Sequence, residues 1–406
     1  RGSHVDPNEQ TPPAGRPTYA AAGEEYRPRR EPVTTYRDRW VAAQAFDVRL
    51  AHATVKDLLV PRLSIYWTDL LITAVIGWSG FALSVVLTPL HPLGIVGLIV
   101  AVVALYRGAL FIHEVVHFRS RAHTRTFGRG WNALVGVWLL IPYFMYEGHA
   151  EHHSRRVYGT ALDGEYIPFA RLSRWEIVKV GASALLLPLF GPIRFGILAP
   201  VSWCVPATRN WVYARASSIK LDLEYVGHPP RPSQRLPWFV QEFACFVIVW
   251  TVGIAVGVGA LPWVLLVCWY LMFAGVSSLD TMRLLGAHRY LGHDSDASIV
   301  LQMIDTINYP SAPIAGFFWG PVGLRMHALH HLVPALPYHA FAEAHRRLTA
   351  VLPANSAYRL TESSGLIAAV IELWRAPRPL PGEHPFDTVA HEDDRRGDST
   401  SASTDC

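Results

Sequence analysis

The feature that most constrains this 406-residue chain is a set of histidines repeated at helical spacing. Residues 148–153 and 327–331 each contain the pattern HxxHH, and residues 113–117 read HExxH. Side chains three and four positions apart share one face of a helix, so each stretch presents its imidazoles together. A zinc site is full with three or four protein ligands, and these histidines are too many for one ion. The pattern predicts two metal ions, and iron is the usual metal for oxygen chemistry.

The predicted metal ligands are the histidines of these three clusters: His113, His117, His149, His152, His153, His327, His330 and His331. A lone histidine on a helix is usually an ordinary surface or core residue. Two separate HxxHH patterns, each beside an apolar block, are hard to explain by packing. The clusters therefore indicate a metal site.

Two long apolar blocks predict an integral membrane protein. No Lys or Arg occurs in residues 63–106 or 237–280, and 51% of the chain is hydrophobic. Each block is long enough for two crossings at about 20 residues per helix, and prolines mark a turn within each. The predicted fold is all-α, with four transmembrane helices in two hairpins. These helices are expected at about 65–87, 93–111, 239–259 and 261–278.

Two other apolar stretches, 131–146 and 177–201, are predicted to be interfacial or re-entrant. The first is short for a crossing, and the second contains three prolines and Arg194. The segment between the two hairpins is basic, which by the positive-inside rule predicts that it is cytoplasmic. Both hairpins then return every histidine cluster to the cytoplasmic side, where the clusters can form one site.

Three regions are expected along the chain. Residues 1–60 are polar and partly disordered; the first four are typical of a cloning remnant, and an amphipathic helix at 42–59 is expected on the membrane surface. Residues 61–350 form the membrane domain. Residues 351–406 form a C-terminal segment that is disordered after about 377. No cleaved signal peptide is expected.

Other classes of function fit the sequence less well. HExxH is also the zinc-protease signature, but an intramembrane protease leaves at least five histidines without a role. A metal transporter needs polar residues inside its crossings, whereas Asp69, Glu242 and Asp280 lie near predicted helix ends. Basic runs with interleaved aromatic residues are absent, so no nucleic-acid partner is expected. The four cysteines form no CxxC pair.

The order of the motifs is similar to that of the membrane fatty acid desaturase family. HExxH is followed by HxxHH, a hydrophobic hairpin and a second HxxHH, and residues 327–339 resemble that family's third histidine box with its Pro- and Tyr-containing continuation. The resemblance covers about residues 65–348. It implies four transmembrane helices under a cytosolic helical cap that holds two non-haem irons.

The resemblance also extends the list of site residues. The family often has a further histidine after the fourth crossing, which His288 matches, and His293 is a possible additional ligand. In acyl-CoA desaturases an Asn lies four residues before this histidine, and here that position is Leu284. Carboxylates near the boxes could orient the ligand imidazoles. These candidates are Glu114, Glu147, Glu151, Asp163 and Asp296.

The activity implied by the resemblance is O₂-dependent oxidation of a fatty acyl chain, with desaturation as the main reading. Hydroxylation and decarboxylation to a terminal alkene are alternatives on the same scaffold. Because no haem-binding, flavin-binding or CxxC iron–sulfur segment is visible, a separate electron donor of ferredoxin, rubredoxin or cytochrome type is expected. Membrane lipid is the expected surrounding partner.

Overall fold

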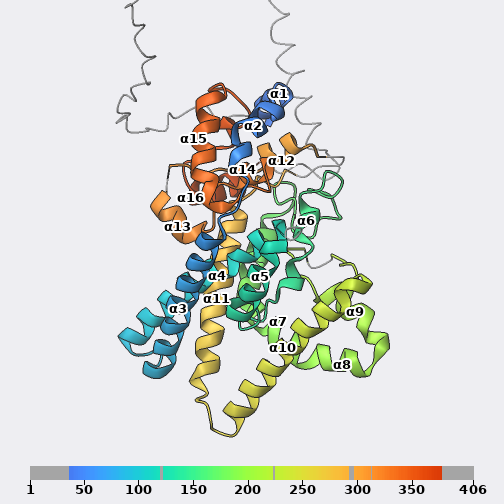
Figure 1. Ribbon diagram of the computed structural model, residues 1–406, viewed down its shortest axis with the longest axis vertical. Coiled ribbons are helices and arrows are strands. Elements are labelled where there is room, and N and C mark those ends of the chain that lie inside the picture. The colour runs from blue at the N-terminus through green and yellow to red at the C-terminus, as the bar shows by residue number, and fades with distance from the viewer. Residues whose placement is uncertain (1–35, 119–121, 223–224, 292–296, 312, 377–406) are drawn as a thin grey trace, which may run out of the picture. The chain divides into compact units, whose positions relative to one another are not determined.

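A computed structural model describes residues 36–118, 122–222, 225–291, 297–311 and 313–376 (Figure 1). The possible ligand His293, the carboxylate Asp296 and the tail predicted to be disordered after 377 lie outside these residues, as do residues 1–35. The described residues form helices, turns and three isolated β-bridges, with no strand among them. This agrees with the predicted all-α class.

The first predicted hairpin consists of α3 (Leu63–Leu87) and α4 (Pro92–His117). At the start of α4, the His91 side chain accepts a hydrogen bond from the Leu93 amide, and Pro92 occupies the first turn, where its missing N–H costs nothing. The helices approach closely at two glycines: a Cβ atom on Gly97 would lie 2.7 Å from the Gly80 carbonyl oxygen. α4 continues through the first histidine cluster, so its last turn enters the site.

The second predicted hairpin consists of α10 (Pro232–Gly257) and α11 (Val264–Leu285). Both helices are longer than predicted. α10 begins with Pro232 in its first turn, and α11 continues past residue 278 to a buried Arg283 that pairs with Asp280 at 2.8 Å. α11 packs against α4 and α7, whereas α10 exposes most of its apolar surface, as a lipid-facing helix does.

The segment between the hairpins contains short helices and one long apolar one. The short elements are α5 (Ala122–Trp131), η2 (Asn132–Gly136), η3 (Tyr143–Tyr146), α6 (His149–His152) and α9 (Pro206–Ala216). α7 (Arg174–Ile193), η4 (Arg194–Leu198) and α8 (Ala199–Cys204) run on without a break. Together they are long and apolar enough to cross a membrane, so the described residues contain five candidate spans where four were predicted.

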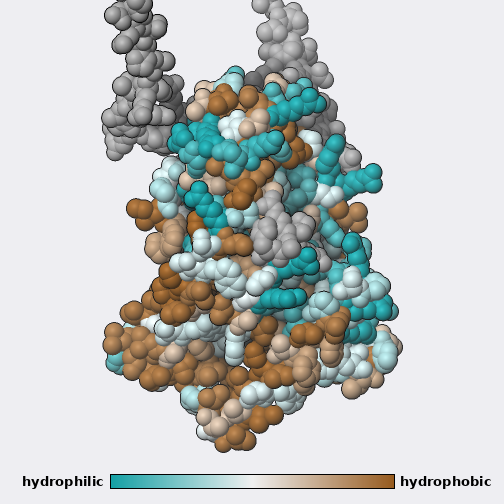
Figure 2. All heavy atoms as spheres, viewed as in Figure 1, coloured by the Kyte–Doolittle hydropathy of each residue, from teal (hydrophilic) through white to brown (hydrophobic). Residues whose placement is uncertain are grey.

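The remaining helices form a cap at one end of the hairpins (Figure 1). Its elements are α1 (Tyr36–Gln44), α2 (Val48–Val55), η1 (Lys56–Leu58), α12 (Ile299–Asp305), α13 (Pro313–Trp319), α14 (His327–Leu332), η5 (Tyr338–Ala340), α15 (Phe341–Val351), η6 (Arg359–Thr361) and α16 (Leu366–Arg375). Figure 2 shows hydrophilic side chains gathered over the cap and hydrophobic ones over the hairpins. The chain is a multi-pass integral membrane protein.

The prediction of an amphipathic helix at 42–59 on the membrane surface is wrong in two respects. Asp47 accepts a hydrogen bond from the Leu50 amide and caps a new helix, so α1 and α2 are separate. The apolar face of α2 is also occupied, because Ala51 and Val55 are fully buried in a cluster with residues of α12, α14 and α15. α2 is therefore part of the cap.

Candidate metal centre

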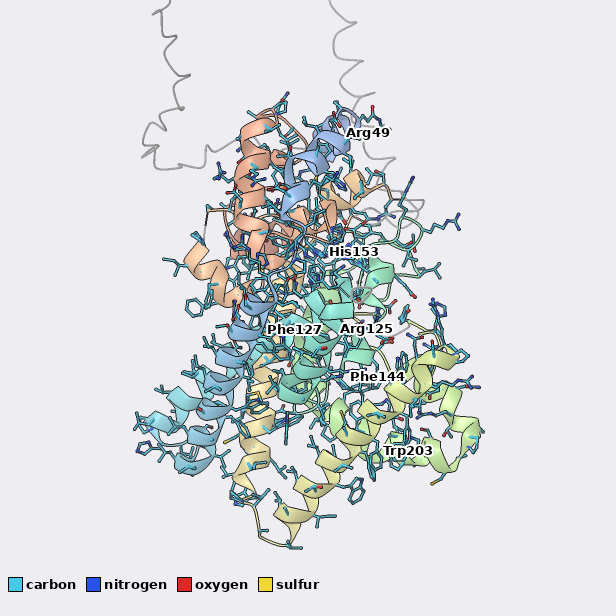
Figure 3. The ribbon with its side chains drawn as sticks, in the orientation of Figure 1. Arg49, Arg125, Phe127, Phe144, His153 and Trp203 are labelled. Carbon is cyan, nitrogen blue, oxygen red and sulfur yellow. The ribbon has the colours of Figure 1, made fainter. Side chains whose placement is uncertain are left out.

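Four distant pieces of chain bring nine histidines together between the cap and the hairpins. His113 and His117 end α4, His288 follows α11, and the other two boxes are carried by α6 and α14. In Figure 3 His153 lies between Arg49 in the cap and Phe127 and Phe144 beside the hairpins. Seven of the nine imidazoles are buried: His113, His149, His152, His288, His327, His330 and His331.

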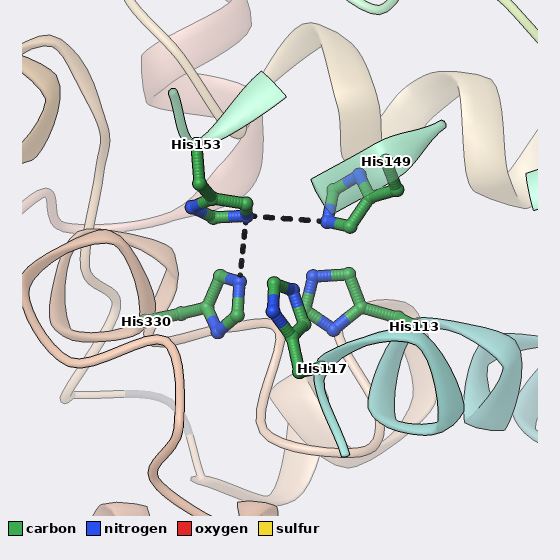
Figure 4. A group of neighbouring side chains, drawn as sticks. All are labelled: His113, His117, His149, His153 and His330. Atoms are coloured by element: carbon green, nitrogen blue, oxygen red, sulfur yellow. Dashed lines mark hydrogen bonds between the residues drawn. The ribbon is translucent and has the colours of Figure 1, made fainter. Parts of the chain in front are cut away.

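The histidines form two groups. The larger group contains His113, His117, His149, His153 and His330, each of which offers a ring nitrogen within 4.8 Å of all the others (Figure 4). The smaller group contains His152, His288 and His331 at the same spacing. His327 adjoins the smaller group, since its Nε2 lies 3.1 Å from Nε2 of His288. The predicted ligands within the described residues therefore lie close together, eight of them in the two groups and His327 beside the smaller one.

Free ring nitrogens make these histidines suitable for holding metal ions. Buried ring nitrogens without a hydrogen-bond partner occur on His113, His117, His153, His327, His330 and His331. A buried polar atom left unsatisfied costs about 1–3 kcal/mol, so a protein that gathers several of them needs another partner for them. Clustered neutral imidazoles are ligands for divalent transition metals.

Burial sets the protonation of these rings. It lowers the pKa well below the usual range for His153, His288, His327, His330 and His331. The imidazoles are therefore neutral near pH 7, which is the form that binds a metal ion.

Carboxylates orient two of the rings. Asp163 Oδ2 lies 2.7 Å from Nδ1 of His152 and also accepts a hydrogen bond from the Gly159 amide. Burial lowers the pKa of His152, but Asp163 outweighs burial and raises that pKa overall. Glu165, which the sequence analysis missed, lies 2.6 Å from Nδ1 of His149. A carboxylate on Nδ1 fixes the tautomer and leaves Nε2 for the metal.

The ring of His288 is held by residues that lie far from it in sequence. The Tyr158 hydroxyl lies 3.0 Å from Nδ1 of His288 and donates to Asp305, which also accepts from Tyr166. No local signal marks these residues, because more than a hundred positions separate Tyr158 from both partners. Glu165 was easier to find, since it follows Asp163 by two residues in the same loop.

Two of the other predicted carboxylates, Glu114 and Glu147, bond to residues outside the histidine groups. Glu114 accepts hydrogen bonds from the Tyr66 hydroxyl and the Tyr338 amide, and Glu147 accepts from Gln234 and Trp238. Glu151 is exposed. The Glu114 carboxylate is thus bonded to Tyr66 and Tyr338, which is unfavourable for the protease alternative, in which this glutamate faces metal-bound water.

The fold and the site define a class of membrane protein. In this class the ends of helical hairpins, together with a cap, enclose two groups of histidines. A family model, fatty acid desaturase, matches residues 89–362, and the chain belongs to that family. It is also 36% identical over 342 residues to a ceramide hydroxylase of Caulobacter vibrioides (strain NA1000 / CB15N), a match that covers 83% of this chain and 97% of the relative. No solved structure matches significantly. The predicted family is confirmed, and the chain is a membrane oxidoreductase of the desaturase family.

Proposed function

We propose that this protein is an O₂-dependent hydroxylase that uses two non-haem irons and acts on ceramide or a similar long-chain lipid. The observation that carries the proposal is the convergence of the two buried histidine groups in a chain of this family. The choice of hydroxylation over desaturation rests on the match to a ceramide hydroxylase along most of both chains. The motifs alone favoured desaturation, with hydroxylation as an alternative; the comparison with the hydroxylase favours hydroxylation instead.

The irons would be held by the two histidine groups, with His327 as a further ligand beside His288. When bound there, they supply the oxidising power that no side chain has for an unactivated C–H bond. Hydroxylation places one atom of O₂ in the product and reduces the other to water, with two electrons and two protons. Desaturation of the same chain consumes the same electrons and protons but releases two waters.

The chain's own residues prepare the site for this chemistry. Asp163, Glu165 and Tyr158 hold the rings of His152, His149 and His288 by their Nδ1 atoms. The burial of the imidazoles excludes water, which strengthens electrostatic interactions and suppresses side reactions. The exposed apolar surface of the hairpins lets a lipid substrate approach the protein from within the bilayer.

The electrons come from a separate donor of ferredoxin, rubredoxin or cytochrome type. Within the described part of the chain, the cysteines stand singly, with Cys245 and Cys268 buried. The histidine groups face the cytoplasm in this proposal, because the segment between the hairpins is basic and the donor must reach them from that side.

An isotope experiment tests the proposal. Purified protein, loaded with ferrous iron and supplied with a reductant system, is given ceramide under labelled O₂. The expected product is a ceramide with one labelled oxygen atom. An unlabelled product lacking two hydrogens identifies a desaturase, the second candidate that the family match supports. In a parallel assay with a free fatty acid in place of ceramide, loss of CO₂ identifies a decarboxylase. Metal analysis that finds one zinc per chain contradicts all three.

A further inference from the structure

Residues 219–222, which follow α9, lie along the second histidine box and bond to both ends of it. The Ile219 amide donates to the Met145 carbonyl at 2.9 Å, and the Leu221 and Asp222 amides donate to the Gly164 carbonyl at 2.9 and 3.0 Å. Met145 precedes the box and Gly164 follows it. We call residues 219–222 the strap, because they join the two ends of the loop that carries three predicted ligands.

Lys220, at the centre of the strap, points into the protein beneath this loop. Its side chain is 7% exposed, and Nζ lies 3.0 Å from Oε1 of Glu165. The other oxygen of Glu165 lies 2.6 Å from Nδ1 of His149. Gly148 makes room for the lysine, since a Cβ atom there would lie 3.0 Å from Nζ. Lys220, Glu165 and His149 thus form a continuous chain of charge-assisted contacts.

We propose that Lys220 is a positioning residue, which sets the ring of His149 through Glu165 and so controls metal binding by the five-histidine group. The inference rests on the proposed function only in that the group holds a metal ion. A carboxylate that contacts a ligand histidine can rotate unless its other oxygen is held, and Lys220 holds it. Partners of this kind typically change metal affinity by about 10–100-fold.

The strap also explains why a lysine is suited to this position. Glu165 is largely buried, with 12% of its side chain exposed, and a buried carboxylate needs a charged partner as well as a hydrogen bond. The flexible stem of lysine reaches it past Gly148 and Gly164, where a Cβ atom would lie 3.0 Å from Cδ of Lys220. Lys220 further lies over the ring of Tyr225, at 5.2 Å from the centroid. The Glu165 carboxylate and the Tyr225 ring together fix the ammonium group.

Titration of ferrous iron into the metal-free, full-length protein tests the inference. Lys220→Met is expected to weaken one of the two binding steps by about 10–100-fold and leave the other unchanged. Asp163→Asn, which releases His152 in the smaller group, is expected to weaken the other step. The matched control is Lys179→Met, since Lys179 also pairs with a glutamate but is 67% exposed; its binding should equal that of the wild type.

Two further variants distinguish a positioning role of Lys220 from a general effect on folding. Lys220→Met leaves Glu165 buried without its cation, whereas Glu165→Gln combined with Lys220→Met buries no unpaired charge. If Lys220 acts through Glu165, the double variant binds iron as Glu165→Gln does, because the effects of coupled residues do not add. Further weakening in the double variant overturns the inference, as does wild-type binding by Lys220→Met. A wild type that binds no iron overturns the proposed function itself.

Discussion

Glu114 stands between two histidines of the first box, yet its carboxylate contacts a different part of the molecule. It accepts hydrogen bonds from Tyr66 of α3 and from the amide of Tyr338, a residue that follows the third box. The Tyr338 hydroxyl in turn donates to Asp69, which pairs with Arg107. Glu114 therefore links the first box to the segment after the third.

We expect Glu114→Gln to retain iron and to remain active, because the amide oxygen can still accept from Tyr66 and Tyr338. Turnover should stay within about tenfold of the wild type, whereas loss of a general base costs about 10²–10⁴-fold. Glu114→Leu removes the acceptor and should destabilise the protein by about 1–3 kcal/mol. Iron content, turnover and the unfolding midpoint measure these effects. Complete inactivity of a folded, iron-loaded Glu114→Gln variant would favour a catalytic glutamate.

At the scale of elements, the first hairpin depends on close approach of two backbones. A Cβ atom on Gly80 would lie 2.7 Å from the Gly97 carbonyl oxygen, and the reverse distance is the same. Small residues of this kind let transmembrane helices pack by van der Waals contact, since lipid provides no hydrophobic force between them. The hairpin carries His113 and His117 into the site, so its packing affects the metal groups.

Gly97→Leu should separate α3 from α4 and lower both the unfolding midpoint and the iron content. The expected loss of stability is about 1–3 kcal/mol, the usual effect of overpacking. Gly253→Leu is the control, because a Cβ atom there would meet nothing within 4 Å although Gly253 also lies in a long apolar helix. Equal midpoints for the two variants would show that the hairpin does not need this contact.

The elements also show what the sequence could and could not predict. The apolar blocks placed both hairpins, and helical spacing identified the clustered histidines, because both signals are local and periodic. Tyr158 and Lys220 escaped prediction, since the residues that they contact are brought near only by the fold. Glu114 lies next to His113 in sequence, yet its carboxylate bonds to Tyr66 and Tyr338, which no local pattern indicates.

At the scale of the whole molecule, burial of several neutral imidazoles makes stability depend on pH. Burial lowers the pKa of His153, His288, His327, His330 and His331 well below the ordinary value of 6.5. In the unfolded chain these histidines bind protons as pH falls through 6.5, while in the folded protein they stay neutral. Their contribution to stability is complete above this pH and is lost below it.

We therefore expect the metal-free protein to lose free energy of unfolding as the pH is lowered from about 7 to about 5, by up to about 1.4 kcal/mol per pH unit for each such histidine. Denaturant unfolding in detergent across this range measures the slope. Substituting Gln for His331 should reduce it, whereas the same change at the exposed His228 should not. A slope of zero would contradict the burial of neutral rings.

The meeting of the histidines also restricts how the chain crosses the membrane. His153 and His288 both contact His331, with ring centroids 4.4 and 5.3 Å from it, so they lie on one face. Between them are three candidate spans: residues 174–204, α10 and α11. An odd number of crossings would place His288 on the opposite face. The strap bonds to Met145 and Gly164 before α10 begins, so the chain has already returned to its starting face.

We predict that residues 174–204 enter and leave the membrane on the face that carries the histidines. This segment contains three prolines and a π-helical turn, and Arg194 within it is buried against Glu242 at 2.8 Å. Such features suit a bent, re-entrant helix better than a straight crossing.

Single cysteines in a background without native ones, labelled by an impermeant maleimide in intact cells and in inverted vesicles, measure this topology. Ser173→Cys and His228→Cys, on either side of the segment, should react only in inverted vesicles, because both positions then face the cytoplasm. Leu90→Cys and Ala260→Cys, at the tips of the two hairpins, should react only in intact cells. Reaction of Ser173→Cys and His228→Cys from opposite sides would mean a fifth crossing, which the convergence of the histidines does not permit.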